Sequence, residues 1–228
     1  MGALTGQPTR RALPGVALLA VLVAGACRLA PAPDGPEAEA ASGARTELAS
    51  VDEAFRACVD GDPSDGLADL DALLADAPRD PDALVARGLC RWARWGDTAD
   101  AADVSGAYED LSAAIAAVEG GRRAHGTALD QIYNHRAFVA RALDGSWVRT
   151  LEDLDRAVAL APIQPTYVLD RGVVHSYAGD SAEARADLRR FLTLADSADT
   201  ERRAVVETLL DRLGPGPADS TARAPAAS

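Results

Sequence analysis

The strongest constraint on the fold of this chain is a set of short motifs that recurs along it in the same order. An Asp-Leu pair follows a Gly-Asp or Gly-Ser pair by eight residues at three places, namely Asp69-Leu70, Asp153-Leu154 and Asp187-Leu188. After the first two of these, a proline follows the aspartate by nine residues, and an Arg-Gly pair follows that proline by nine more. A self-similar period of about 34 residues indicates an array of helical repeats, whose core forms only when neighbouring units stack.

Aligning these motifs divides residues 46–213 into four units and a final helix. The units are about 47–80, 81–120, 131–164 and 165–198, and the helix is 199–213. Each unit contains two helical stretches, which we expect to be joined at its Gly-Asp or Gly-Ser pair. The final helix carries Val205, Leu209 and Leu213 on one stripe and charged residues on the other, which is typical of a capping helix that faces solvent.

The second unit departs from this spacing. Six extra residues separate its Gly96-Asp97 pair from its Asp-Leu pair, and we expect them to lengthen a turn or a helix. The glycine-rich residues 119–129 predict a loop before unit three. Asp, Ser or Thr at the start of each second helix caps free N–H groups, and the candidates are Ser64 or Asp65, Thr98 and Ser181.

The order of small residues, turns and leucines resembles the tetratricopeptide-repeat family. The matching positions are Gly61-Asp62, Leu70, Leu73 and Pro78 in unit one; Arg87-Gly88, Gly96-Asp97, Ala107, Leu111 and Ala114 in unit two; Ala137, Gly145, Leu154, Ala157 and Pro162 in unit three; and Gly172, Gly179-Asp180, Ala184, Leu188 and Leu192 in unit four. The resemblance implies an all-α, right-handed solenoid of about four helix hairpins plus a C-terminal capping helix.

The same resemblance implies a concave groove, lined by the first helices of the repeats, that holds a peptide. The positions carried over to this chain are Val51, Phe55, Val85, Leu89, Trp92, Asn134, Phe138, Arg141, Leu169 and Val173. Most are apolar, and the chain has no lysine with which to clamp a terminal carboxylate, so an amphipathic or extended peptide is the expected occupant. A groove that is narrow and self-filled, or covered by a second copy, is the alternative.

The N-terminus predicts export. Residues 1–26 combine Arg10 and Arg11 with an apolar run too short to span a bilayer and a small-residue cleavage site. The Cys27 that follows resembles the lipidated cysteine of bacterial lipoproteins, with plain secretion and an uncleaved anchor as alternatives. Residues 27–45 are rich in Pro, Ala, Glu and Gly and predict a flexible tether, and residues 214–228 predict a disordered tail.

Charge and motif content argue against several functions. A formal net charge of −12 disfavours nucleic acid and broad contact with anionic lipid, which leaves the N-terminal anchor as the expected membrane contact. The three histidines lack zinc spacing, and no nucleophile elbow or phosphate loop occurs. The acidic run from Asp60 to Gly66 places its glycine wrongly for a calcium loop. We therefore expect no catalytic residue, metal or cofactor.

Two local features have competing interpretations. The run from Arg91 to Trp95 places two tryptophans beside two arginines, an arrangement that binds carbohydrate or peptide by stacking, although packing into a neighbouring repeat is favoured. Cys58 and Cys90 are expected to be buried, unpaired thiols, because cysteine is a common small core residue. The oxidising compartment implied by export would permit a disulfide instead.

Together these observations predict a non-enzymatic scaffold or adaptor of the bacterial cell envelope that binds a protein or peptide in its groove. Self-association through the same face is a further expectation. The alternative function is a module that binds envelope polysaccharide or a peptidoglycan fragment through the region of Trp92 and Trp95.

Overall fold

The structure, a computed structural model, describes residues 50–215, all of which belong to the second of two compact units of the chain, 39–228. The predicted signal peptide, Cys27, the predicted tether and residues 216–228 of the predicted tail lie outside the described residues. Residues 50–215 contain helices and no strand. None of the helices in this part is both long and apolar enough to cross a membrane.

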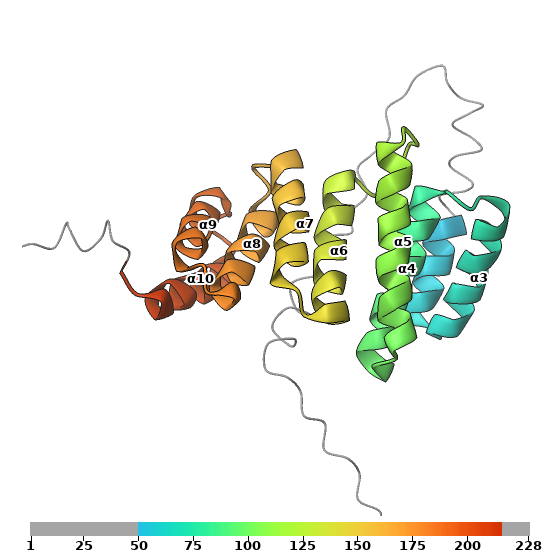
Figure 1. Ribbon diagram of the computed structural model, residues 1–228, viewed down its shortest axis with the longest axis horizontal. Helices are drawn as coiled ribbons and strands as arrows, with labels where there is room; N and C mark the ends of the chain where they lie inside the picture. The colour runs from blue at the N-terminus through green and yellow to red at the C-terminus, as the bar shows by residue number, and fades with distance from the viewer. Residues whose placement is uncertain (1–49, 216–228) are drawn as a thin grey trace, which may run out of the picture. The chain divides into compact units, whose positions relative to one another are not determined.

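The helices pair into successive antiparallel hairpins that lie side by side in chain order (Figure 1). The pairs are 50–60 with α3 (Pro63–Asp76), α4 (Pro81–Thr98) with α5 (Ala101–Glu119), α6 (Leu129–Asp144) with α7 (Trp147–Leu160), and α8 (Pro165–Ala178) with α9 (Ser181–Leu194), followed by α10 (Thr200–Leu213). The predicted all-α array of helix hairpins is thus confirmed.

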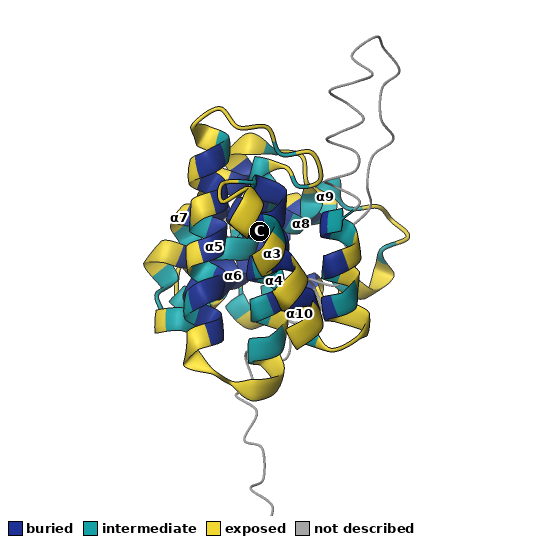
Figure 2. Ribbon diagram, turned by 90° about the vertical axis from the view of Figure 1, so that its right-hand side faces the viewer, coloured by how far each residue is buried: buried dark blue, intermediate teal, exposed yellow. Residues whose placement is uncertain are grey.

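The leucine of each Asp-Leu pair lies at the centre of the core. Leu70, Leu111, Leu154 and Leu188 are fully buried, and Figure 2 shows buried residues on the helix faces that meet. A Cβ atom on Gly172 would lie 3.0 Å from Cβ of Asp187 on the facing helix, which is closer than ordinary contact allows. The small residue in the first helix is therefore what lets the two helices of a hairpin approach so closely.

The helix caps differ from those predicted. The carboxylates of Asp62 and Asp100 accept backbone N–H bonds and cap α3 and α5, whereas Ser64 and Thr98 had been the candidates. Ser181 is the first residue of α9. The N-cap of this helix is Asp180, and the Asp180 side chain makes no capping hydrogen bond. In α3 the reason is Pro63 at the first helical position, which suits proline and makes the residue before it the cap.

The extra residues of unit two lengthen both of its helices. α4 has 18 residues and α5 has 19, against 14 in each of α8 and α9. The predicted turn at Gly96-Asp97 is wrong, because α4 continues to Thr98 and the chain reverses at Ala99. Ala99 has a φ of 56°, in the left-handed region where the hairpin turns of units three and four place Gly145 and Gly179.

Replacing Ala99 with glycine should therefore stabilise the protein by roughly 0.5–1 kcal/mol, because glycine adopts a positive φ without a Cβ clash. Urea unfolding followed by circular dichroism measures the change. The matched variant Gly179→Ala, at a φ of 96°, should shift stability in the opposite direction. Equal stability of Ala99→Gly and the wild type would contradict this account of the turn.

Cys58 and Cys90 form a disulfide, so the expectation of two unpaired thiols is wrong. Their Cα atoms are 5.9 Å apart, within the range that a disulfide spans. Cys90 lies in the middle of the lengthened α4. Its Sγ atom is also 3.6 Å from the carbonyl oxygen of Pro63. Units one and two are thus joined covalently.

α10 closes the array against α9. Leu209 of α10 is buried, as its apolar stripe predicts, but Val205 of that stripe is 39% exposed, and the neighbouring Val206 is buried in its place. Arg203, expected on the solvent face, is half-buried and donates to the carbonyl oxygen of Leu192 at 2.8 Å. Arg185 of α9 donates in return to the carbonyl oxygens of Leu213 and Gly214, so arginines hold both ends of the terminal helix.

Candidate functional site

The structure buries most of the residues that were carried over as groove positions. Val51, Val85, Asn134, Phe138, Leu169 and Val173 are buried, each with less than a tenth of its surface exposed. Phe55, Leu89, Trp92 and Arg141 are partly exposed. Only these four can present appreciable surface to a partner, and the groove as a binding site stays a prediction.

The C-terminal part of this face is closed by polar contacts between successive first helices. Asn134 of α6 donates to Asp170 Oδ2 of α8 at 2.9 Å, and both groups are buried. Tyr167 of α8 donates its hydroxyl proton to Asp130 Oδ2 at 3.0 Å. Because these side chains bond one another across the helix interface, they are not directed at a ligand.

A loop is fastened to the N-terminal turn of α4. The buried carboxylate of Asp82 accepts the backbone N–H groups of His125, Gly126 and Thr127 at 2.7, 3.0 and 3.2 Å. The predicted 119–129 loop is therefore held in one place, and Asp82 serves to anchor it.

The part of the face that stays accessible is apolar and aromatic. Phe55 of the helix 50–60 and Leu89 and Trp92 of α4 are partly exposed. Trp92 stacks on Trp95, with ring centroids 4.8 Å apart and planes 18° from parallel. This set of residues, Phe55, Leu89, Trp92 and Trp95, is here named the aromatic face.

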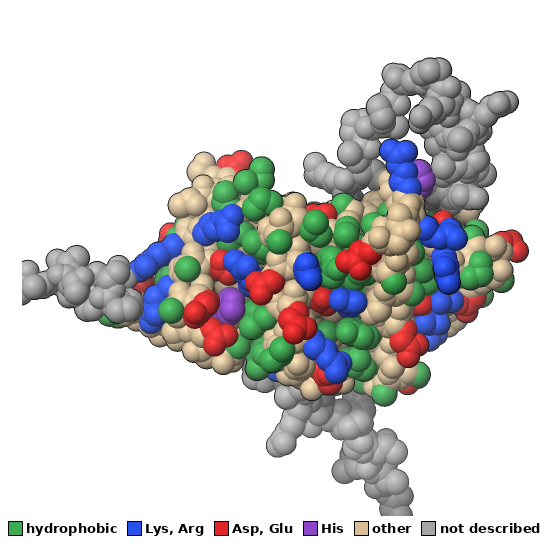
Figure 3. All heavy atoms as spheres, turned by 45° about the horizontal axis from the view of Figure 1, so that its top comes forward, with side chains coloured by type: hydrophobic (Ala, Val, Ile, Leu, Met, Phe, Trp, Pro, Cys, Tyr) green, Lys and Arg blue, Asp and Glu red, His purple; other side chains and the backbone are tan. Residues whose placement is uncertain are grey.

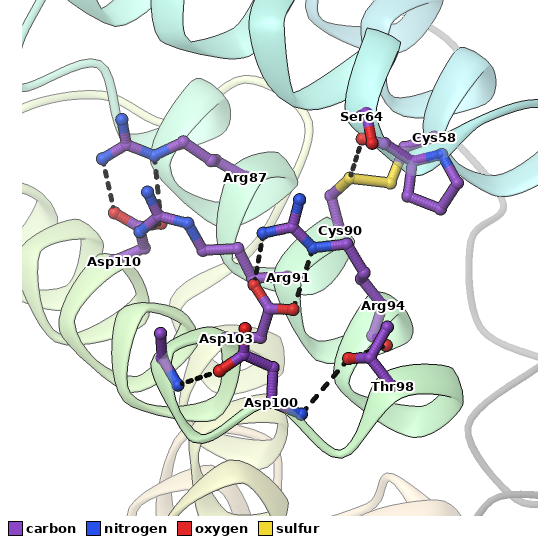
Figure 4. Close-up of polar contacts among 12 residues, drawn as sticks. Cys58, Ser64, Arg87, Cys90, Arg91, Arg94, Thr98, Asp100, Asp103 and Asp110 are labelled. Carbon is purple, nitrogen blue, oxygen red and sulfur yellow. Dashed lines mark hydrogen bonds and ion pairs between the residues drawn. A yellow bond between two sulfur atoms is a disulfide. The ribbon is translucent and has the colours of Figure 1, made fainter.

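The arginines beside these tryptophans are engaged elsewhere. Arg94 binds both oxygens of Asp103 at 2.8 and 2.5 Å, and Arg91 binds Asp110 at 2.8 Å (Figure 4). Both carboxylates are buried and come from α5. An open depression of about 420 Å³ lies beside these pairs, but Glu109 also lines it, so its charges of both signs largely cancel.

The recurring Arg and Asp residues of the sequence form a repeated clamp. Each arginine binds both carboxylate oxygens of the aspartate in the Asp-Leu pair of its own unit. Each arginine also contacts one residue of the preceding unit, two positions after the aspartate of that unit's Asp-Leu pair. The sets are Arg87 with Asp110 and Asp71, Arg136 with Asp153 and Ser112, and Arg171 with Asp187 and Asp155. The hydrogen bonds that Arg171 donates to Asp187 raise the pKa of Arg171 above its ordinary value. The motif thus has a structural role, holding three helices together.

Sequence reasoning missed a second aromatic cluster. The guanidinium of Arg141 lies 3.8 Å from the ring centroid of Trp147, and the Trp147 and Tyr177 rings are within 3° of parallel. Arg141 and Trp147 flank the α6–α7 turn and are six residues apart, but Tyr177 lies 30 residues further on, near the end of α8, so no local motif indicates the whole cluster.

Two titratable groups, one on α8 and one on α6, have pKa values shifted by burial. Burial raises the pKa of Asp170 to about 7, against the hydrogen bond from Asn134 and the charge of Arg202, which lower it. Burial lowers the pKa of His135 to about 4. Within residues 50–215, no group of three or more His, Cys, Asp or Glu side chains is arranged to hold a metal ion.

Comparison with known proteins identifies the fold. No protein-family model matches the sequence, and no curated protein matches it. Among solved structures, a thermophilic TPR protein of Thermus thermophilus, TTC0263, is similar with a TM-score of 0.53 and 20% identity over 74% of this chain and 83% of that one. MamA is similar with a TM-score of 0.54 and 15% identity, over 75% and 87%.

A third similar structure is the APC/C hetero-tetramer Cut9-Hcn1, with a TM-score of 0.59 and 14% identity. The match covers 74% of this chain but 30% of that chain, so this protein corresponds to a minor part of it. At such identities the three likenesses establish a shared fold.

Proposed function

From the premise that this chain has the tetratricopeptide-repeat fold, we propose that it is a non-enzymatic scaffold or adaptor of the bacterial cell envelope that binds a protein or peptide segment. The observation that carries the proposal is the aromatic face. Its side chains are only partly covered, whereas Phe138 of unit three and Leu169 and Val173 of unit four are buried. Partly exposed aromatic side chains that lie together are typical of protein-binding surfaces.

The aromatic face favours a peptide over a polysaccharide. Trp92 and Trp95 stack on each other, so each ring has one face already covered. The guanidinium groups of Arg91 and Arg94 bind buried carboxylates rather than lying beside an open ring. A sugar therefore finds neither a free pair of ring faces nor an available cation there, while an apolar side chain of a peptide needs only the exposed edge.

A photo-crosslinking residue at Leu89 tests the proposal in cells that express the full chain. We expect adducts with defined envelope proteins, identified by mass spectrometry, and a loss of at least about tenfold in adduct when Trp92→Asp is added, since hot-spot side chains contribute about 2 kcal/mol or more. A crosslinker at Ile163, which is 78% exposed on the α7–α8 turn, is the control. Equal adducts from both positions, or none from Leu89, would overturn the proposed face.

Export and anchoring through Cys27 complete the proposal. The motifs of residues 1–26 support export, and the disulfide between Cys58 and Cys90 supports it independently, because disulfides persist in oxidising compartments and are rare in the cytosol. A lipid on Cys27 followed by the tether would hold the repeat domain away from the membrane that carries it.

Replacing Cys27 with alanine is expected to move the protein from the detergent phase to the aqueous phase in a phase-partition experiment on exporting cells. The lipid chain on the cysteine would supply the membrane affinity, and alanine cannot be acylated. A Cys90→Ala variant, which keeps Cys27, should partition like the wild type. If Cys27→Ala and the wild type partition alike, the anchor is wrong, while the adaptor function is unaffected.

A further inference from the structure

A compact cluster of aromatic rings and one arginine lies where units three and four meet. Arg141 is near the end of α6, Trp147 is the first residue of α7, and Tyr177 is near the end of α8. The Arg141 guanidinium lies 3.8 Å from the centroid of the Trp147 ring. The rings of Trp147 and Tyr177 are parallel to within 3°, with centroids 6.3 Å apart.

The local backbone fixes this arrangement. Trp147 packs with Leu151 against the buried core side chains of Ala137, Leu154 and Val174. Gly145, with a φ of 73°, forms the α6–α7 turn, and a Cβ at this position would come within 2.8 Å of Arg141 Nη1. The turn glycine therefore leaves the space that the guanidinium occupies, and the cluster needs little ordering when a partner binds.

The cluster presents apolar surface and one uncompensated cation. Tyr177 is 45% exposed, and Val148, the residue after Trp147, is 67% exposed. Arg141 forms no ion pair with any carboxylate of residues 50–215. The neighbouring carboxylate of Asp144 is already bound by Arg149, so it does not neutralise Arg141.

The surrounding polar groups are also satisfied. Asp144 accepts the backbone N–H of Ser146, and the Ser146 hydroxyl oxygen accepts the backbone N–H of Arg149. A sugar would require several unengaged acceptors and donors around the ring on which it stacks, and this turn has already used its own. A ligand that carries an apolar group and a single anion does not require these additional hydrogen-bond donors and acceptors.

The combination of apolar surface with an unpaired cation differs from the rest of the chain's surface. Figure 3 shows acidic and basic side chains interspersed over one face, with hydrophobic side chains between them. All three clamp arginines are bound to carboxylates, so a cation stacked on an indole without an acidic partner is a distinct feature. Trp, Tyr and Arg are the residues most enriched in the energetic centres of protein interfaces.

We propose that Arg141, Trp147 and Tyr177 form a docking site for a peptide segment in which an apolar side chain lies next to a carboxylate. The apolar side chain packs on the exposed Tyr177 ring, and the carboxylate pairs with Arg141, whose stacking on Trp147 holds its donors in place. The proposal rests on the function proposed above, that the chain binds protein segments, and adds a second contact point with a defined chemistry.

The test is a selection of random displayed peptides on the full chain in detergent, followed by fluorescence-anisotropy titration of the selected sequences. The titrations use wild type, Arg141→Gln, Tyr177→Ala and the control Arg156→Gln, an exposed arginine further along α7 whose replacement leaves the Arg149–Asp144 pair intact. Each selected peptide is also made with its acidic residue changed to the matching amide. Circular dichroism establishes that all four proteins have the same helix content.

We expect selected peptides to share an apolar residue beside Asp or Glu and to bind at least about tenfold more weakly to Arg141→Gln and Tyr177→Ala, because a charge-assisted hydrogen bond contributes about 1.5–3 kcal/mol. The acid-to-amide change should weaken binding to wild type by a similar factor and leave binding to Arg141→Gln unchanged. Arg156→Gln should bind like wild type.

Peptides without an acidic residue, equal binding to wild type and Arg141→Gln, or the absence of any enriched peptide would each overturn the site. The crosslinks expected from Leu89 are independent of this cluster. If they form while the selection fails, the adaptor function stands and the Arg141 site does not; if both fail, the adaptor function falls as well.

Discussion

Replacing both Cys58 and Cys90 with alanine is expected to lower the free energy of unfolding of unit one by about 3–4 kcal/mol. The disulfide links residues 32 positions apart, and the chain entropy that a loop of this length removes from the unfolded state corresponds to roughly that value. Both cysteines are almost fully buried, so alanine is the replacement that leaves no polar group unsatisfied there.

Unit one should be especially sensitive because it lacks the arginine clamp of the other units. Asp69 occupies the Asp-Leu position but is exposed, and it forms no ion pair within residues 50–215. The helix 50–60 contains no counterpart of Arg87. Arg87 itself contacts unit one only at Asp71 of α3. The covalent bond to α4 therefore takes the place of the ionic contacts that hold the later hairpins.

Native-state hydrogen exchange measures this prediction unit by unit. Because repeats contact mainly their neighbours, amides of residues 50–76 should lose protection while those of α8 and α9 keep theirs. Val148→Ala, an exposed change in unit three, serves as the control and should alter neither region. An equal loss of protection along the whole array, or no loss at all, would show that the disulfide does not hold unit one.

The repeat spacing predicted the hairpins because the residues that define the spacing are the ones that pack between the helices. The leucine of the Asp-Leu pair is buried in every unit, and the small residue of the first helix sets the close approach of its partner. The clamp was not predicted, although its residues were visible as recurring motifs. Arg87 and Asp110 are 23 positions apart, and Arg136 and Asp153 are 17 apart, so no short-range spacing reports that they meet.

The binding face was less predictable than the fold. Helical position indicates which side of a helix a residue faces, but not how closely the next helix covers that side. Phe55 and Phe138 were equivalent groove positions by resemblance, yet Phe55 is partly exposed and Phe138 is buried. The stacking of Trp147 on Tyr177 depends similarly on how two successive hairpins pack together, which the sequence of either hairpin does not contain.

Asp170→Asn is expected to stabilise the protein increasingly as the pH rises from about 4 to about 8. Burial raises the pKa of Asp170 in the folded protein to about 7, whereas an aspartate in an unfolded chain titrates near 3.9. Between these values the folded state keeps a proton that the unfolded state has released. Stability of the wild type therefore falls as the pH rises through this window, and it levels off above pH 7.

Asparagine removes this dependence without removing the hydrogen bond. Asn134 donates to Asp170 Oδ2, and an asparagine side-chain oxygen can accept the same bond. The attraction of Arg202, which lowers the pKa of Asp170, is lost in the variant and reduces its gain. The difference in unfolding free energy between Asp170→Asn and wild type should thus be small at pH 4 and approach about 2–4 kcal/mol at pH 8.

Hydrogen exchange of α8 amides at pH 5 and pH 8 and urea unfolding over the same range give the two stability curves. Comparing the variant with wild type cancels the contribution of His135, whose pKa lies below its ordinary value and whose effect on stability has the opposite sign. Asp69→Asn, a change at an exposed aspartate, should leave the slope of the wild type unaltered. The difference in unfolding free energy between Asp170→Asn and wild type could instead be the same at every pH, and Asp170 would then be ionised in the folded protein. In that case the α6–α8 contact must accommodate a buried charge that Asn134 alone does not balance.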